Sequence, residues 1–398
     1  MTTMSVRRKV LIVIGQLEVG GTERHLLNTL PQVLCGSLDV QIYCLRGGGK
    51  LEPEFVAAGV PVFSPAHHSR RWLGLLKTGI HLIRTLRRLR PDVVHYFLPE
   101  AYLLGGICSL FSPPSVRIMS RRSLNAYQLK WPFARFIETC LHRRTDAILA
   151  NSNAVLRDLL DEGVHADRCA VIYNGVEVPT RIGAQSAVRE ALRIGQDVVV
   201  FVMVANLIPY KGHADVIEAF RIARTNSTVA STLLLIGADS GIETELRQQT
   251  SDAGLDSAVH WLGLRADVGA CLDASDIALL GSHEEGFSNA ILEAMAHGLP
   301  TIVTDVGGNR EAVSDGVTGI VVPPSDPGAM AGAMSCLLAD PTLRSSMGRA
   351  GRERASAKFH TAQCRDAYRR LYLAISSSPD NSIADLIGAR SSDVNELG

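Results

Sequence analysis

Residues 277–298 read IALLGSHEEGFSNAILEAMAHG, and the order of residue types in this stretch decides the fold class. The four apolar residues 277–280 are typical of a buried strand, and a short polar loop follows them. The alanines, leucine and methionine further on favour a helix, which His-Gly followed by Leu299-Pro300 would end. The stretch therefore predicts a strand, a loop that ends in Glu285, and a helix that begins near Gly286.

The start of such a helix is suited to bind a phosphate, because free backbone N–H groups and the positive end of the helix dipole meet there. Gly286 allows a close approach of the backbone, and Ser288 adds a hydroxyl. Glu293 lies roughly 12 Å further along the helix than Glu285, so it would contact another part of an elongated ligand. An anion flanked by two acceptors for hydroxyl groups describes a nucleotide-sugar. A capped surface helix with two solvated glutamates is the alternative for this segment alone.

The rest of the chain alternates strand-like and helix-like patterns. Apolar runs at 9–14, 93–97 and 198–204 are typical of buried parallel strands, and a helical pattern follows each of them. This alternation predicts an α/β fold with doubly wound parallel sheets. Pro179 and Gly183 interrupt the alternation before it restarts. We therefore expect two Rossmann-like domains in tandem, with a ligand cleft at the carboxyl ends of the strands.

The segment from Glu285 to Glu293, with Gly-Phe-Ser-Asn inside it, resembles the signature of the retaining glycosyltransferases of family four, which have the GT-B fold. Further segments resemble this family from residue 9 to about 375. They are Gly20-Gly21-Thr22-Glu23, residues 92–100, Asn151-Ser152, Asn174-Gly175-Val176, Lys211-Gly212, residues 264–267 and residues 306–311.

The resemblance implies a domain plan. An acceptor-binding Rossmann-like domain would span 1–178, and a linker 179–196 would join it to a nucleotide-sugar-binding domain, 197–358. A final helix within 359–376 would cross back to the first domain, as in GT-B enzymes. We expect residues 377–398 to be a flexible tail, in which Ile383–Ile387 could form a short helix.

The resemblance also implies roles for single residues. Glu293 would hold the ribose hydroxyls of the donor and Glu285 its sugar hydroxyls, while Lys211 and the backbone N–H groups of 286–288 would hold the diphosphate. Catalytic roles would fall to Glu285, Lys211 and His95. The full expected donor-binding set is Gly21, Asn206, Lys211, Arg265, Glu285, Gly286, Phe287, Ser288, Asn289 and Glu293.

The sequence departs from the family pattern at two positions. Asn206 stands where relatives have an arginine, and Phe97 stands where they have a second histidine. Arg121 or Arg122 could supply the missing cation. UDP is the default donor base, and the acceptor could be a glycan, a lipid-linked saccharide or a small molecule.

Composition and charge fit this interpretation. The 398 residues are 46% apolar and 20% charged, as in ordinary globular proteins of two domains. Residues 1–178 carry 22 basic and 14 acidic side chains, whereas residues 179–398 carry 18 and 26. The basic first half could approach an anionic membrane or an acidic acceptor, and a dipolar protein without such a partner is the alternative.

A helical pattern over 72–89 concentrates this positive charge and is the candidate for membrane contact. Its alternative is a solvated helix packed on the sheet. The cations of the segment are Arg70, Arg71, Lys77, Arg84, Arg87, Arg88 and Arg90.

Eight scattered cysteines form no Cys-x-x-Cys pair, which indicates reduced thiols in a cytosolic protein. We see no secretory signal and no apolar run of membrane-spanning length. A cytoplasmic location follows, with peripheral contact at the inner face of a membrane left open. We expect no metal and no cofactor beyond the nucleotide-sugar substrate, and no nucleic-acid partner.

Other function classes remain. A GT-B epimerase or glycan phosphorylase could use the same pocket around Lys211. A non-catalytic nucleotide-sugar-binding partner is suggested by Asn206 and Phe97. A Rossmann oxidoreductase is disfavoured, because the turn after the first strand lacks a full Gly-x-Gly-x-x-Gly.

Overall fold

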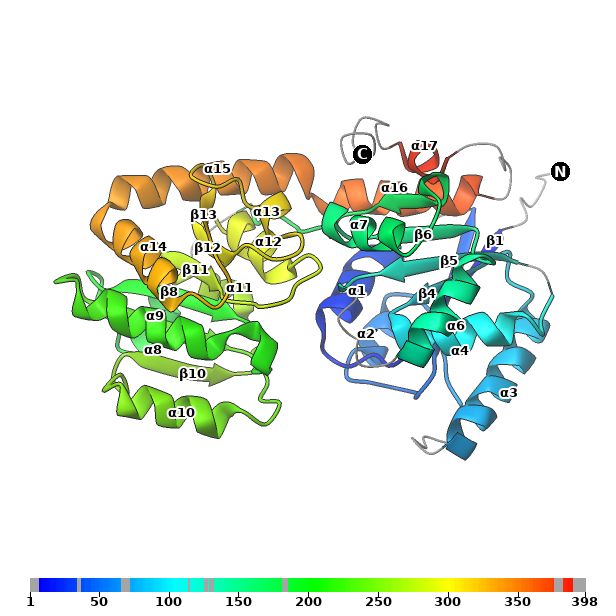
Figure 1. Cartoon of the computed structure of the whole chain (residues 1–398), viewed down its shortest axis with the longest axis horizontal. Helices are drawn as coiled ribbons and strands as arrows, with labels where there is room; N and C mark the ends of the chain where they lie inside the picture. Colours follow the sequence, from blue (N-terminus) through cyan, green and yellow to red (C-terminus); the bar gives the residue numbers. More distant parts are fainter. Residues whose placement is uncertain are drawn as a thin grey trace. The chain divides into compact units, whose positions relative to one another are not determined.

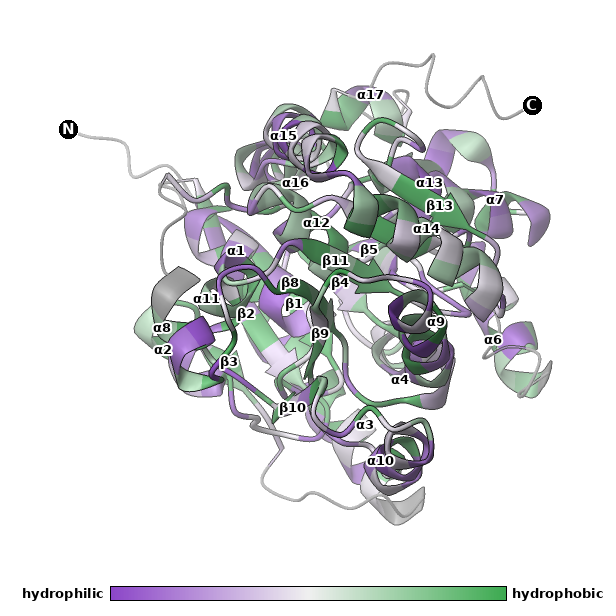
Figure 2. Ribbon diagram, turned by 90° about the vertical axis from the view of Figure 1, so that its left-hand side faces the viewer, coloured by the Kyte–Doolittle hydropathy of each residue, from purple (hydrophilic) through white to green (hydrophobic). Residues whose placement is uncertain are grey.

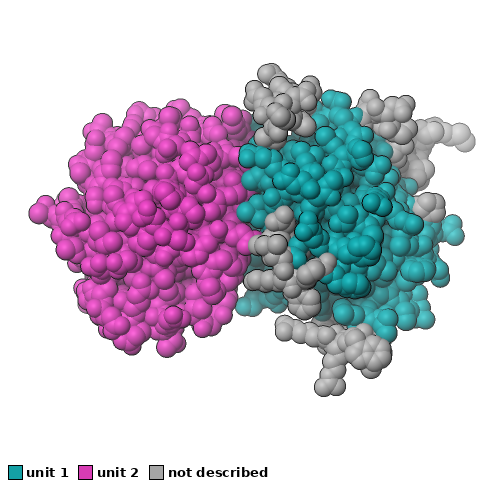
Figure 3. All heavy atoms as spheres, viewed as in Figure 1, with its two compact units in different colours: residues 1–175, 361–398 teal, residues 176–360 magenta. Residues whose placement is uncertain are grey.

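The computed structural model forms two compact units, each built on one parallel sheet. Unit 1 comprises residues 1–175 and 361–398, and unit 2 comprises residues 176–360 (Figure 3). The predicted fold class, two Rossmann-like α/β domains, is confirmed. The structure describes residues 7–33, 37–65, 72–113, 115–124, 128, 132–180, 185–375 and 382–388, so Arg70 and Arg71 lie outside it.

The sheet of unit 1 has the strand order β3-β2-β1-β4-β5-β6-β7, and all its pairs are parallel. Strand order reverses between β1 and β4, where Ile12 pairs with Ile42 on one side and His95 on the other. The strands are β1 (Arg8–Ile14), β2 (Leu38–Cys44), β3 (Val62–Phe63), β4 (Val93–Phe97), β5 (Val116–Arg121), β6 (Ala147–Ala150) and β7 (Cys169–Val171).

Helices cover both faces of this sheet, because both faces of its strands are apolar. Along β1, Val10 and Ile12 belong to one apolar cluster, whereas Leu11 and Val13 belong to the other. The first cluster receives side chains from α1 (Gly21–Val33), α2 (Glu52–Ala57), α16 (Thr361–Ala374) and α17 (Ile383–Ile387). The second receives them from α3 (Trp72–Leu89), α4 (Pro99–Ser109), α6 (Pro132–His142) and α7 (Asn153–Asp161).

The final long helix returns to the first unit, as predicted. Helix α16 packs beside α1, and its Tyr368 and Leu371 lie in the same apolar cluster as β1. Part of the tail that the sequence predicts as flexible also joins this cluster. Ile383 and Ile387 of α17 are buried there, because their spacing places them on one side of the short helix.

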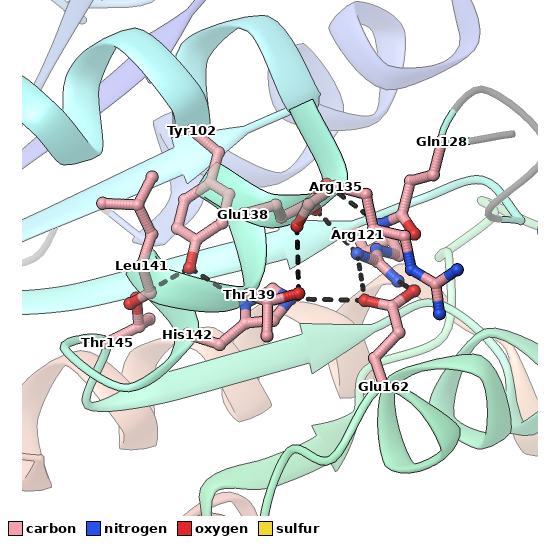
Figure 4. A network of polar contacts seen from close by, with 10 residues as sticks. All are labelled: Tyr102, Arg121, Gln128, Arg135, Glu138, Thr139, Leu141, His142, Thr145 and Glu162. Atoms are coloured by element: carbon pink, nitrogen blue, oxygen red, sulfur yellow. Dashed lines mark hydrogen bonds and ion pairs between the residues drawn. The ribbon is translucent and has the colours of Figure 1, made fainter. Parts of the chain in front are cut away.

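A buried polar network joins α6 to β5 and to the end of α7 (Figure 4). The Arg121 guanidinium donates to Glu138 at 2.6 Å and to Glu162 at 2.6 and 2.9 Å. His142 lies 3.3 Å from the same Glu162 and 2.9 Å from the Tyr102 hydroxyl. The Arg121 side chain has no exposed surface, so it serves the interior of unit 1 and not a substrate.

The sheet of unit 2 has the order β10-β9-β8-β11-β12-β13 and is also wholly parallel, with the reversal between β8 and β11. Apolar residues make up most of these strands (Figure 2). The strands are β8 (Val199–Val204), β9 (Ser231–Ile236), β10 (Val259–Gly263), β11 (Ile277–Leu280), β12 (Thr301–Thr304) and β13 (Gly319–Val322).

Helices again cover both faces of the second sheet (Figure 1). One cluster includes side chains of α9 (His213–Thr225), α10 (Glu243–Asp252), α14 (Pro327–Ala339) and α15 (Pro341–Lys358). The other includes side chains of α8 (Gln185–Ala191), α11 (Val268–Asp273) and α12 (Asn289–Ala296). A short helix, α13 (Asn309–Ala312), follows β12.

The segment 179–196, predicted as a linker, contains α8 and belongs to unit 2. Arg189 of α8 donates to the carbonyl of Ala274 at 2.9 Å and to Asp276 at 2.8 Å. Asp276 in turn accepts from the backbone N–H of Val200 at the start of β8. Within the described ranges, no helix combines the length and apolarity that a bilayer crossing requires.

Candidate active site

Two loops of unit 2 meet at the carboxyl edge of its sheet, one after β8 and one after β11. These strands are neighbours, and the helices that follow them, α9 and α12, pack on opposite faces of the sheet. Such a reversal of strand order leaves a crevice at the strand ends, which is where open α/β sheets bind ligands. The backbone N–H of His283 donates to the Tyr210 carbonyl at 2.7 Å and holds the loops together.

Glycines allow this close approach. Gly212 has a left-handed backbone conformation, with φ of 72°, and a Cβ added there would overlap the carbonyl oxygen of Gly281. Lys211 ends the 3-10 turn Pro209–Lys211, and α9 begins two residues later. The sequence thus places the ammonium correctly at the start of a helix.

The two predicted charged residues of these loops form an ion pair. Lys211 Nζ lies 2.6 Å from Glu285 Oε2, and the side chains are 18% and 13% exposed. The Ser282 hydroxyl donates to the same carboxylate oxygen at 3.3 Å. Because water screens a largely buried pair weakly, this interaction fixes both side chains at the carboxyl edge of the sheet. The pair offers an ammonium for an anion and a carboxylate for hydroxyl groups.

A third loop, after β12, supports the backbone at Glu285. The N–H of Gly308 donates to the Gly286 carbonyl at 3.0 Å, and a Cβ on Gly307 would overlap the Glu285 carbonyl oxygen. The Thr304 hydroxyl donates to the Ser282 carbonyl at 2.5 Å. The segment 306–311, noted in the sequence as a family match, therefore positions Glu285.

Helix α12 begins at Asn289, three residues later than the sequence predicts. Ser288 is its N-cap residue in an extended conformation, and no side-chain hydrogen bond caps the helix. The prediction was wrong here because Phe287 turns inward and packs on Phe359, with ring centroids 5.4 Å apart. The positive end of the helix dipole therefore lies at Ser288 and Asn289, not at Gly286.

The remaining donor-site predictions of unit 2 lie on separate elements of the fold. Glu293 is half-buried on α12, one turn after Asn289. Asn206 follows β8, and its carboxamide oxygen accepts from the Ala238 N–H at 3.0 Å, so it joins two loops of the same edge. Arg265 follows the edge strand β10 and pairs with Asp267 at 2.6 Å.

The predicted site residues of unit 1 differ in accessibility. Gly21 is exposed as the first residue of α1. His95 has no exposed surface, and its ring nitrogens lie 2.7 Å from the Tyr372 hydroxyl and 2.8 Å from the Ser120 hydroxyl. Burial lowers the pKa of His95 well below its ordinary value. This geometry fits a packed core residue and offers no nitrogen to a substrate, so it disfavours the predicted catalytic role.

Sequence reasoning missed two histidines beside Lys211. His283 Nε2 lies 2.6 Å from Asp215 Oδ2, which ties the loop after β11 to α9. His213 is buried directly after Gly212, and burial lowers its pKa to about 4. Both histidines could have been found from the sequence, because His213 directly follows Lys211-Gly212 and His283 lies two residues before Glu285-Gly286. In the part of the chain that the structure describes, no three His, Cys, Asp or Glu side chains are placed to hold a metal ion.

Comparisons with known proteins agree with the sequence motifs. Residues 19–178 match the family model described as Glycosyltransferase Family 4, and residues 185–354 match the one described as Glycosyl transferases group 1. A D-inositol 3-phosphate glycosyltransferase of Corynebacterium urealyticum is 26% identical over 96% of this chain and 97% of its own. A glycogen synthase of Mycobacterium tuberculosis is 27% identical over 75% of this chain and 73% of its own.

Solved structures share the fold. Anabaena HepE in complex with UDP and glucose has a TM-score of 0.81 at 22% identity, and the match covers 90% of this chain and 97% of HepE. WaaG, a glycosyltransferase involved in lipopolysaccharide biosynthesis, has a TM-score of 0.72 at 15% identity, over 92% of this chain and 100% of WaaG.

Proposed function

Because the chain is a glycosyltransferase of family four with the GT-B fold, we propose that it moves a sugar from a nucleoside-diphosphate donor, a UDP-sugar by default, to a glycan, lipid-linked or small-molecule acceptor. The observation that carries this proposal is the Lys211–Glu285 pair at the strand reversal of unit 2. HepE, a solved protein of the same fold, has been determined with UDP and with UDP-glucose, which supports the choice of base.

Each residue of the site then has a role. Lys211 and the positive dipole end at the start of α12 bind the diphosphate, since both supply positive potential. Glu285 accepts hydrogen bonds from the sugar hydroxyls, and Glu293 accepts them from the ribose. Unit 1 is assigned the acceptor, with Gly21 at its exposed helix start.

The proposed reaction retains the configuration at the anomeric carbon. The bond from that carbon to the diphosphate oxygen breaks as the acceptor oxygen attacks from the same face, and the acceptor proton passes to the leaving oxygen. Lys211 stabilises the negative charge that builds on the diphosphate, which is the kind of contact that lowers a barrier most. Metal independence belongs to the proposal, with Lys211 and the helix start in the place of a cation. Asn206 and His95 have no role in the proposed reaction, because their side chains form hydrogen bonds with Ala238 and with Tyr372.

The proposal is tested with a panel of UDP-, GDP- and ADP-sugars. Thermal shift selects the donor, and transfer to a set of acceptors is followed by mass spectrometry with and without EDTA. We expect stabilisation by one donor, a product heavier by one sugar, retained anomeric configuration by NMR, and no loss of rate with EDTA. Donor binding without any product, or a free epimer or sugar phosphate from donor alone, would assign one of the other function classes.

The same proposal includes a cytoplasmic location at the inner face of a membrane and a role in polysaccharide synthesis. Recovery of the enzyme itself only from a secreted fraction would contradict this location.

A further inference from the structure

Three neighbouring helices of unit 1 expose most of the large apolar side chains that lie at the surface. Of thirteen exposed large hydrophobic residues in the described ranges, eight lie on α3, on α4 with its following turn, and on α6. These eight residues are Leu75, Leu76, Ile80, Ile107, Leu110, Phe111, Phe133 and Phe136. Helix α4 packs against both α3 and α6 (Figure 1). We call the outer side of these helices the three-helix face.

The phenylalanines of this face are unusually accessible. Phe111, Phe133 and Phe136 are 59%, 76% and 66% exposed, although phenylalanine is among the side chains most often buried. Phe133 and Phe136 lie three residues apart on α6 and therefore point to the same side. Single exposed apolar residues are ordinary, but a group of them on one surface marks a binding face.

Helix α3 is not a simple surface helix packed on a sheet. Such a helix keeps its apolar residues inside, and α3 does bury Leu82 and Leu86. Yet Leu76 and Ile80, which share a side with Arg84 at four-residue spacing, are about half exposed. The outer side of α3 is thus apolar at its start and basic at its end.

The charge on the three-helix face is mainly positive, although the exposed Asp146 follows the turn after α6. Neither residues 55–91 nor residues 101–137 contain an aspartate or a glutamate. Glu138 of α6 is buried against Arg121, and Glu100 in the first turn of α4 is paired with Arg46. The exposed cations of these helices and the turn after α6 are Lys77, Arg84, Arg87, Arg88, Arg135, Arg143 and Arg144.

We propose that the three-helix face docks on the surface of an anionic lipid bilayer. The three phenylalanines insert at the boundary of headgroups and acyl chains, and the surrounding cations contact anionic headgroups. A second copy of the chain fits this face poorly, because two basic surfaces repel each other. Each cation near the membrane surface strengthens such binding about fivefold. The docking proposal does not depend on which acceptor the enzyme uses, since the three-helix face is distant in sequence from the loops that are proposed to bind the donor.

The test is co-sedimentation of the whole chain with lipid vesicles. One set contains only phosphatidylcholine, and the other contains about 30% phosphatidylglycerol, which gives the negative surface potential. We expect at least about tenfold tighter binding to the anionic vesicles, and a loss of this preference at high ionic strength.

Two pairs of variants separate the apolar and the charged contributions. The double variant Phe133→Ser with Phe136→Ser should lower the affinity for anionic vesicles about tenfold or more. Its control is Val56→Ser with Val317→Ser, which should not lower this affinity, because these valines lie outside the three-helix face and are 55% and 56% exposed. Lys77→Glu with Arg84→Glu should abolish binding, whereas Arg349→Glu with Lys358→Glu on α15 makes the same change in net charge and should not. Circular dichroism and melting temperature confirm that each variant folds.

Several results would overturn the proposal. One is the absence of binding to anionic vesicles at low ionic strength, and another is an equal effect of test and control variants. Self-association that the phenylalanine variants abolish, measured by sedimentation velocity, would assign the face to a second copy. Donor binding is measured by thermal shift on the same preparations, so failure of the docking proposal is distinguished from failure of the proposed function.

Discussion

Lys211 Nζ lies 2.6 Å from Glu285 Oε2, although 74 positions separate the two residues in the sequence. The contact exists because β8 and β11 are neighbours at the point where strand order reverses. Gly212 and Gly281 let the two loops touch, and Gly307 supports the second loop from the other side. The pair is therefore a product of the topology, which brings together two loops that are far apart in the sequence.

Removal of either charge at this pair should affect the chemical step. We expect Lys211→Ala or Glu285→Ala to lower turnover on the order of a hundredfold or more, as loss of a preorganised stabilising group does. The measurement is kcat in a transfer assay with radiolabelled donor. Lys358→Ala, an exposed lysine of the same unit, is the control and should keep the wild-type rate. Near wild-type turnover in the Lys211 or Glu285 variant would refute the assigned role.

Gly307 should tolerate no side chain. Its φ of 51° is strained for alanine, and the added Cβ would also overlap the Glu285 carbonyl. Gly307→Ala should lower the free energy of unfolding by about 1–3 kcal/mol through strain, with a further loss from overlap, and should reduce activity by displacing Glu285. Gly316→Ala is a matched control, because its φ is 72° and no atom lies within 4 Å of the added Cβ. Chemical denaturation compares the two, and equal losses would contradict the overlap.

The fold was predictable because apolar strands alternate with helical segments from Arg8 onward, and this alternation is a local pattern. Strand order depends on contacts between segments that are far apart in the sequence. The sequence therefore located Lys211 and Glu285 on two loops but did not show that their side chains touch. The helix start near Gly286 was misplaced because the inward turn of Phe287 depends on Phe359, a residue distant in the chain. The burial of a short apolar segment is also hard to predict from the sequence. Ile383–Ile387 could be predicted as a short helix, but the burial of α17 depends on its packing against α16.

His95 illustrates the limit of a motif match. The motif identified a histidine on a buried strand, where His95 is the central residue of β4, but only packing decides whether its nitrogens face a substrate. We expect His95→Asn to keep kcat within about threefold while lowering the melting temperature, because its role is to join β4, β5 and α16 by hydrogen bonds. Tyr372→Phe removes one of those bonds and should show the same pattern. A hundredfold loss of kcat with an unchanged melting temperature would restore the catalytic assignment.

The buried network around Arg121 should make unit 1 sensitive to acid. Burial alone would raise the pKa of Glu162, but hydrogen bonds from His142 and Arg121 outweigh it and hold the pKa at about 2. A lowered pKa means that this carboxylate contributes stability above about pH 4.5, and that the contribution is lost as pH falls toward 2. Glu162→Gln should cost about 3 kcal/mol or more at neutral pH, as loss of one partner of a buried ion pair does, and should flatten the acid limb of the stability curve. Asp161→Asn, an exposed neighbour, should leave both unchanged.

His213 should give unit 2 a different pH dependence. Burial lowers its pKa from the ordinary value near 6.5 to about 4, so the folded state favours the neutral ring. The unfolded chain binds a proton first as pH falls, and stability therefore decreases between about pH 6.5 and 4, by about 3 kcal/mol in total. Denaturant unfolding of unit 2 at a series of pH values should show this slope in the wild type and lose most of it in His213→Asn. The exposed His165→Asn variant is the control, and a slope that persists in His213→Asn would show that other groups cause it.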